Sequence, residues 1–163
     1  MSNILAKRVS LLLAVAALLA LPAAAGAHAK AIARPRAEST LLRQINLVRR
    51  EHGLHALAYD PTLARAALSH SQHMAATDTF AHGAFATRMV RFHVRGPIVG
   101  ENLAWGTGSY GTARGIVDAW LKSPEHRANL LRPGYRRVGL GEVTATFLGY
   151  GGARVVTADF AGL

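Results

Sequence analysis

The feature that most constrains the fold is a change of residue pattern at Pro133. Before this residue, apolar side chains recur at the three- and four-residue spacing of helices. After it, residues 137–143 and 153–160 alternate or cluster β-favouring residues on either side of a glycine-rich turn at 148–152. Helices first and strands last, with no strand–helix–strand alternation, predict an α+β domain in which helices pack on a small antiparallel sheet.

Five helical segments are expected before the strands. Ser39 is expected to cap the first helix, and Gly53 to stop it. Asp60 followed by Pro61 is typical of an N-cap and a first helical residue, and predicts the start of the second helix. The expected ranges are 39–52, 61–76, 86–92, 112–121 and 124–130.

The chain has 163 residues and no cysteine. This length favours one domain. The lack of cysteine excludes a disulfide scaffold, a cysteine-ligated metal site and thiol chemistry. Any catalytic or metal-binding chemistry must therefore use histidines, carboxylates and other oxygen or nitrogen donors.

The first 29 residues are typical of a secretory signal peptide. Lys7 and Arg8 form a positive start, an apolar run covers 11–21, and Ala27-His28-Ala29 is suited to cleavage. The run is shorter than the ~20 residues of a membrane-spanning helix, which argues against a membrane anchor. We therefore predict a secreted or cell-envelope protein, with a flexible basic lead-in over 30–38 and the folded domain over 39–163.

The chain is strongly basic, with 19 Lys and Arg against 9 Asp and Glu and a formal net charge of +10. Its arginines are dispersed along the sequence, whereas a nucleic-acid-binding protein concentrates cations and aromatic residues on one element. We expect no specific nucleic-acid binding. Weak contact with anionic surfaces of the cell envelope is the expected consequence of the charge.

Three polar residues at separate junctions are the candidates for chemistry. His82 follows an aromatic residue in TDTFAHG, Glu101 lies between glycines in VGENLAWG, and His126 lies on the first turn of the helix that Pro124 begins. Two imidazoles and a carboxylate can hold a divalent ion with open positions, or form an acid–base network. Glu101 could equally bind backbone amides in a glycine-flanked loop.

A structural role is one of the interpretations considered for His70 and for Arg88. His70 and His73 have the H-x-x-H spacing of a ligand pair, but the apolar residues on the same helix face favour His70 as a hydrogen-bonded core residue. Arg88 could form a buried ion pair behind the site, with a partner that the sequence does not name.

The order of several strings resembles the bacterial branch of the CAP superfamily, which includes cysteine-rich secretory proteins, antigen 5 and pathogenesis-related proteins (the SCP domain). The strings are DPTLARAALSHSQHMA, FAHG, GENLAWG, SPEHRANLL, YRRVGLG and VVTADFAG, and the resemblance covers about residues 39–161. It implies an α-β-α sandwich with a central antiparallel sheet. It also implies a cleft lined by His82, Glu101 and His126, with zinc or another divalent cation bound by the two histidines.

The sequence departs from the family pattern at one position of this cleft. The animal and plant branch has a second glutamate three residues after the helix tryptophan, where this chain has Ser123 after Trp120. Glu125 could substitute, but adjacent helical residues point about 100° apart, so we do not expect Glu125 and His126 to share the cleft. With one acid fewer, cation affinity is expected to be lower.

Two functions are compatible with this pattern. The first, which we favour, is a secreted module that binds a small lipid, peptide or glycan, with the His/Glu cleft supporting structure or a metal. The second is a metal-assisted, peptidase-like hydrolase with Glu101 as general base. No G-x-S-x-G motif is present to supply a serine nucleophile.

Overall fold

A computed structural model describes residues 36–162. The predicted signal peptide and residues 30–35 of the predicted lead-in lie outside the described residues. The elements, in chain order, are α1 (Arg36–Glu51), β1 (Ala58–Tyr59), α2 (Pro61–Thr77), α3 (Phe85–Arg91), β2 (Val99–Gly106), the 3-10 turn η1 (Gly108–Gly111), α4 (Ala113–Lys122), α5 (Pro124–Leu130), β3 (Tyr135–Phe147) and β4 (Tyr150–Gly162).

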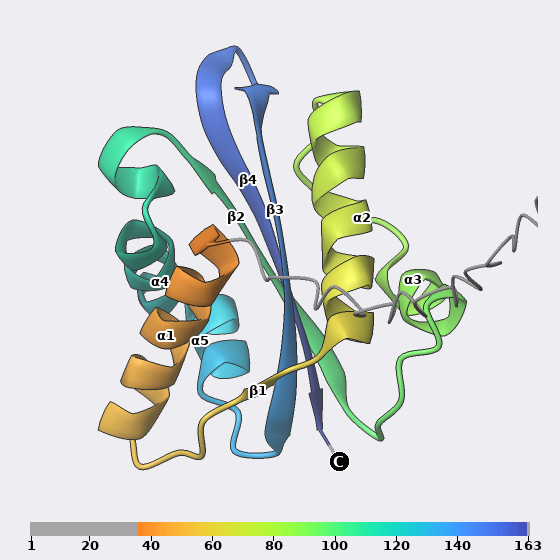
Figure 1. Ribbon diagram of the computed structural model, residues 1–163, viewed down its shortest axis with the longest axis vertical. Coiled ribbons are helices and arrows are strands. Elements are labelled where there is room, and N and C mark those ends of the chain that lie inside the picture. Colours follow the sequence, from red (N-terminus) through yellow and green to blue (C-terminus); the bar gives the residue numbers. More distant parts are fainter. Residues whose placement is uncertain (1–35, 163) are drawn as a thin grey trace, which may run out of the picture. The chain divides into compact units, whose positions relative to one another are not determined.

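The sheet lies between two layers of helices (Figure 1). Helix α2 packs against β3 and β4 on one face, with α3 beside it. Helices α1, α4 and α5 cover the other face. The α+β class and the α-β-α sandwich are therefore confirmed.

The sheet has the strand order β1-β3-β4-β2. β3 and β4 form the expected hairpin, and β2 pairs antiparallel with β4. β1 pairs parallel with β3 through two residues, so the sheet is mixed rather than wholly antiparallel. A two-residue strand is too short to show an alternating pattern, which is why the sequence did not predict it.

The VGENLAWG segment is an edge strand, not the loop expected from its flanking glycines. Its register places Glu101 opposite Asp159 of β4. Successive residues of a strand face opposite sides of the sheet, so Glu101 and Leu103 face α2, while Asn102 and Ala104 face α4 and α5.

Local signals predicted the helices well. Asp60 caps α2, accepting hydrogen bonds from the backbone N–H groups of Thr62 and Leu63. Thr112 caps α4, and Pro124 begins α5. The first helix begins at Arg36, three residues before the expected start, so Ser39 lies within it and is not its cap. Ala37 and Glu38 are favourable helix formers, which is consistent with this earlier start.

Two glycines of β3 let α2 lie directly on the sheet. A Cβ added at Gly139 would lie 2.0 Å from the backbone nitrogen of Ala64, and one at Gly141 would lie 2.2 Å from that of Leu68. Both distances are far below van der Waals contact. This close approach fixes the position of α2 and with it that of His70. No helix within residues 36–162 has the length and apolar character needed to cross a membrane.

Candidate functional site

A cleft of about 240 Å³ lies at the edge of the sheet formed by β2. His82 reaches it from the loop between α2 and α3, Glu101 from β2, and His126 from α5. These elements belong to different layers, and they meet here because no strand covers the outer edge of β2 within residues 36–162. The cleft is also lined by Phe85, Glu125 and Asn129.

Glu125 lines this cleft together with His126, contrary to the expectation that it would point elsewhere. Glu125 and Asn129 are four residues apart on α5, and His126 and Asn129 are three apart, so the three side chains form one stripe along the helix. The cleft therefore has an exposed carboxylate at its rim in addition to the buried Glu101.

The carboxylate of Glu101 is buried, with its side chain 2% exposed. One oxygen, Oε1, accepts a hydrogen bond from Nδ1 of His82 at 2.7 Å, and Oε2 pairs with the Arg88 guanidinium. Glu101 therefore binds side chains, not the backbone amides that its glycine-flanked position suggested.

Behind Glu101 lies a group of buried polar residues that we call the polar cluster: His70, Arg88, Glu101 and Asp159. Asp159 is fully buried, and its Oδ1 lies 3.8 Å from Nη2 of Arg88. His70 lies 3.9 Å from Glu101 Oε2 and hydrogen-bonds through Nε2 to the carbonyl oxygen of Ala81. The unnamed partners of Arg88 are thus Glu101 and Asp159, and His70 is a hydrogen-bonded buried residue, as its apolar helix face favoured.

Burial shifts the pKa values of the polar cluster. It raises the pKa of Glu101 to about 7, although Arg88 opposes this. Burial and the neighbouring Glu101 raise the pKa of Asp159 well above its usual range. Burial and the positive charge of Arg88 lower the pKa of His70 to about 4. At neutral pH His70 is therefore neutral, and the charged form of Asp159 is disfavoured.

His126 is held in place by α5 and β2. Its Nδ1 lies 2.8 Å from Oγ of Ser123. Its carbonyl oxygen accepts a hydrogen bond from the Asn102 side chain, and Asn129 donates to the Glu101 carbonyl. Burial and the neighbouring His82 lower the pKa of His126.

Three residues that anchor the site were not singled out from the sequence: Asp159, Asn102 and Asn129. Asp159 shares the inward-facing alternation of Val155 and Thr157 in β4, and an acid at such a position is a detectable signal. The two asparagines lie in the GENLAWG and SPEHRANLL strings, but only the tertiary structure shows that Asn129 donates to Asn102 Oδ1.

Both cleft histidines are anchored through Nδ1, and within residues 36–162 neither Nε2 atom has a hydrogen bond to an acidic or carbonyl group of the protein. A histidine that gives Nδ1–H to a carboxylate and offers Nε2 to a metal is the usual arrangement of a metal ligand. The described part of the chain contains no group of three or more His, Asp or Glu residues placed to hold a metal. The two imidazoles of this cleft are fewer than the three or four protein ligands of the usual zinc site.

Comparison with known proteins places these features in one family. The family model described as CAP, the cysteine-rich secretory protein family, matches residues 42–160. Among curated proteins, the chain is 33% identical over 109 residues to the uncharacterized membrane protein YlbC of Bacillus subtilis (strain 168), in a match that covers 64% of this chain and 31% of YlbC.

Solved structures agree with this match. An extracellular protein containing a SCP domain from Bacillus anthracis str. Ames is 26% identical, with a TM-score of 0.64, over 77% of this chain and 40% of that chain. An outer surface protein from Borrelia burgdorferi, at 24% identity and a TM-score of 0.64, shares the fold over 77% of this chain and 91% of its own. The chain spans less than half the length of YlbC and of the Bacillus anthracis protein.

Proposed function

Because the chain belongs to the CAP family of cysteine-rich secretory proteins, we propose that it is an exported ligand-binding module whose cleft holds a divalent cation between His82 and His126. The observation that carries the proposal is the common anchoring of the two imidazoles: Glu101 holds Nδ1 of one and Ser123 holds Nδ1 of the other. With both Nδ1 atoms engaged, Nε2 is the nitrogen that each ring would offer to a cation in this proposal, with zinc the first candidate.

In this proposal Glu101 is a positioning residue. Its oxygens are occupied by His82 and Arg88, and its side chain is almost fully buried, so it orients an imidazole and adds negative charge nearby. With only two protein ligands, a bound cation keeps open positions and exchanges readily. The cation would supply a Lewis-acidic point that attracts an oxygen of the ligand.

The ligand in this proposal is a small lipid, peptide or glycan outside the cytoplasmic membrane. The cleft volume of about 240 Å³ is suited to one group of such a molecule rather than to the whole of it. Support for export comes from the secretory leader predicted by sequence and from the likeness to an extracellular SCP-domain protein. The basic charge favours additional weak contact with anionic envelope surfaces.

One observation favours the alternative of metal-assisted hydrolysis. A pKa of about 7 is suited to a general base at neutral pH, and Glu101 has this value. A general base must, however, reach water or substrate, and both carboxylate oxygens of Glu101 are engaged by other side chains. Binding is therefore the better supported function.

Metal content tests the proposal directly. The protein purified without a chelator or an affinity tag is measured beside the His82→Ala/His126→Ala double variant. A His52→Ala/His55→Ala variant, which removes two exposed histidines at the end of α1, is the matched control. Zinc retained or rebound by the wild type and the control, and lost by the cleft variant, is the expected result. Equal metal content in all three proteins would contradict a cation in this cleft.

Export is tested separately by intact-mass analysis of the protein recovered outside the cytoplasmic membrane. The leader predicts a mature chain that begins near Lys30. A chain that keeps Met1 in the membrane fraction would contradict export by cleavage.

A further inference from the structure

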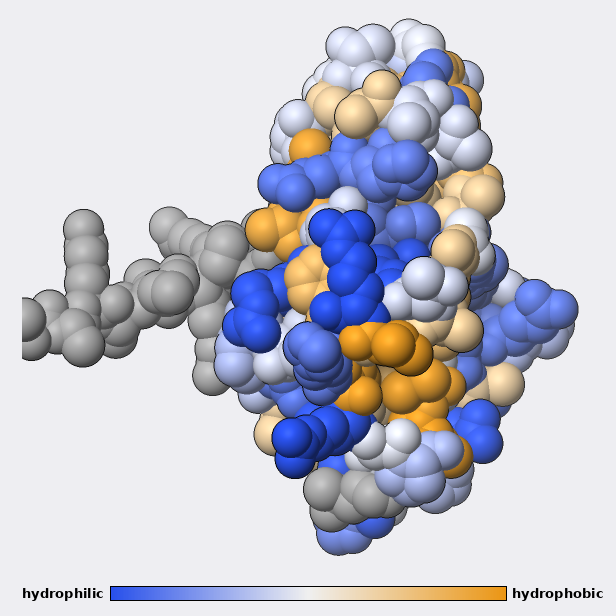
Figure 2. Space-filling model, turned by 90° about the vertical axis from the view of Figure 1, so that its right-hand side faces the viewer, coloured by the Kyte–Doolittle hydropathy of each residue, from blue (hydrophilic) through white to orange (hydrophobic). Residues whose placement is uncertain are grey.

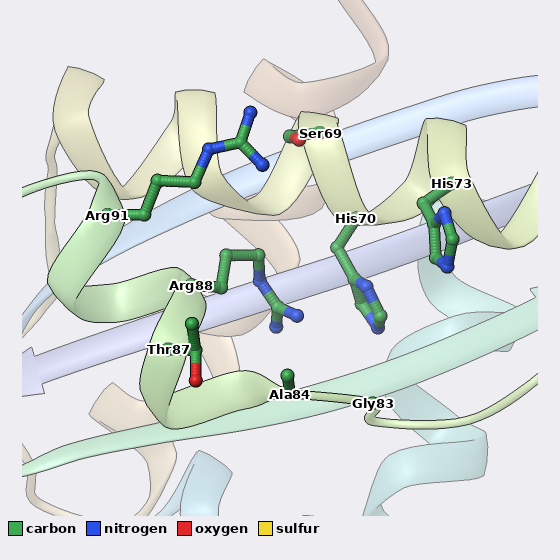
Figure 3. A pocket seen from close by; sticks show the side chains of 8 residues that line it. All are labelled: Ser69, His70, His73, Gly83, Ala84, Thr87, Arg88 and Arg91. Carbon is green, nitrogen blue, oxygen red and sulfur yellow. The ribbon is translucent and has the colours of Figure 1, made fainter.

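A second cavity, of about 300 Å³, lies between α2 and α3. Figure 3 shows Ser69 and His73 on α2, and Thr87, Arg88 and Arg91 on α3. The Arg91 side chain extends toward Ser69 of α2, whereas the guanidinium of Arg88, which pairs with Glu101 of β2, turns toward the strands. None of the residues that line the cleft of His82 and His126 lines this groove, so the two cavities are separate.

The groove has cations but no acid in its wall. No Asp or Glu is among the described residues that line it. Arg91 is exposed, packs its guanidinium over the Phe92 ring, and has no ion pair with an acid of residues 36–162. Arg88 binds Glu101 through Nη2, while its buried Nε has no hydrogen-bond partner in the described part of the chain. The groove thus has one cation without an acidic partner among the described residues, Arg91, beside Arg88, which is paired with Glu101.

His70 forms part of the wall of this groove. Burial lowers the pKa of His70, and the positive charge of Arg88 lowers it further. Figure 2, which faces the α2 and α3 side, shows strongly hydrophilic residues gathered in the middle of this face beside a hydrophobic patch.

We propose that this groove binds a phosphate group carried by a small molecule. Arg88 and Arg91 lie one helical turn apart on α3, and the hydroxyl-bearing residues Thr87 of α3 and Ser69 of α2 also line the groove. Donors on two sides suit a tetrahedral oxyanion, whereas the two oxygens of a planar carboxylate are satisfied by one guanidinium fork. The volume leaves room for an organic group attached to the phosphate.

The proposal is tested by titrating the 15N-labelled protein with inorganic phosphate and with glycerol 3-phosphate, using acetate as the planar comparison. Backbone signals of Ser69, Thr87 and Arg91 are expected to shift saturably with both phosphates and more weakly with acetate. Arg91→Gln removes a charged donor and should weaken binding about tenfold or more. Arg43→Gln, which removes an exposed arginine of α1 on the opposite layer, should change it by less than about twofold because salt screens distant charges.

Vesicles distinguish the source of the phosphate. Sedimentation with phosphatidate vesicles that depends on Arg91 assigns the group to a lipid headgroup, whereas binding of glycerol 3-phosphate without vesicle binding assigns it to a soluble ligand. Either result supports the phosphate site. Equal weakening by Arg91→Gln and Arg43→Gln, or no saturable shift with any phosphate, would overturn it. Because the groove shares no residue with the metal cleft, the His82→Ala/His126→Ala variant should still bind phosphate if only the metal proposal fails.

Discussion

The two faces of the sheet are built on different principles. The face covered by α1, α4 and α5 has one continuous apolar core that includes Trp120, Tyr135 and Phe160. The face covered by α2 and α3 has two smaller apolar groups, one around Met74 and Leu103 and the other around Leu63 and Met89. The polar cluster lies between these two groups, because inward positions of β4 run from Val155 through Asp159 to Ala161.

Most of the hydrophobic stabilisation therefore lies on one face of the sheet, and the polar cluster lies on the other. Burying a carboxylate and a guanidinium costs free energy of desolvation, which their mutual attraction often only balances. The continuous core on the opposite face supplies the hydrophobic stabilisation that the polar face lacks. One face can therefore keep a costly set of buried charges next to the cleft without unfolding the domain.

The largest effect is expected on the apolar face. Trp120 is 1% exposed and donates its indole N–H to the Leu103 carbonyl at 2.8 Å. Trp120→Ala removes this bond and leaves a cavity, so the free energy of unfolding should fall by about 3–5 kcal/mol. Urea unfolding followed by circular dichroism measures this fall, and zinc binding by the folded fraction should be nearly unchanged. A loss below about 1 kcal/mol would contradict the assignment of stability to this face.

A similar or slightly smaller effect is expected from breaking the buried ion pair. Arg88→Met leaves Glu101 and Asp159 without their cation and should cost about 3–4 kcal/mol. Arg88 lowers the pKa of Glu101, so this pKa should be higher still in the variant. Relative to the wild type, the variant should therefore lose most stability above pH 7, where keeping a proton on the buried carboxyl, or ionising it without Arg88, costs free energy.

Two variants sharpen this measurement. Arg65→Met removes an exposed arginine of α2 that bonds only Thr62 among the described residues, and it should change stability by less than about 0.5 kcal/mol. The Arg88→Met/Glu101→Gln double variant should be more stable than the sum of the single losses predicts, since the two groups are coupled. Additive losses would mean that the pair does not act as a unit.

The third effect is a pH dependence carried by His70. Its pKa falls from 6.5 in the unfolded chain to about 4 in the folded one, so between these values the folded state binds fewer protons and stability rises with pH. Relative to His70→Gln, the wild type should lose up to about 3 kcal/mol between pH 7 and pH 4. Urea unfolding at several pH values measures the difference. A constant difference across this range would contradict a neutral buried His70.

The smallest effect is expected at Asp159. Burial and the neighbouring Glu101 disfavour the charged form of Asp159, and Asp159→Asn keeps the shape of the side chain without the charge, so the free energy of unfolding should change by less than about 1 kcal/mol. Because the pKa of Asp159 is raised in the folded protein, the folded state binds this proton more tightly than the unfolded state does. The stability of the wild type should therefore fall relative to that of the variant as pH rises. A large loss at pH 7 would mean that Asp159 is ionised and pairs with Arg88.

Local signals in the sequence were sufficient for α2, α4, α5 and the terminal hairpin, because caps, prolines and glycine turns act within a few residues. They failed for β2, whose central Glu101 and Asn102 make it a poor strand by composition. Tertiary contacts override this preference: Glu101 binds His82 and Arg88 on one face, while Asn102 binds the α5 backbone on the other.

The same reasoning explains what was predictable about the candidate site. His82, Glu101 and His126 were identified because their strings resemble a family, and not because spacing along the chain brings them together. Asp159 was missed because its importance depends on the β2–β4 register that places it opposite Glu101. The shared cleft of Glu125 and His126 was missed because the angle between adjacent residues says nothing about how the end of a short helix faces a cavity.

His82 and His126, which reach the β2 edge of the sheet from its two opposite sides, are proposed to bind one common cation. Long-range 1H–15N spectra of the imidazoles during a zinc titration test this proposal most directly, because they report each ring nitrogen separately. Nε2 of His82 and Nε2 of His126 are expected to shift together, saturating at about one equivalent, while Nδ1 of His82 keeps its hydrogen bond to Glu101. Shifts at only one of the two histidines, or earlier shifts at His73, would contradict it.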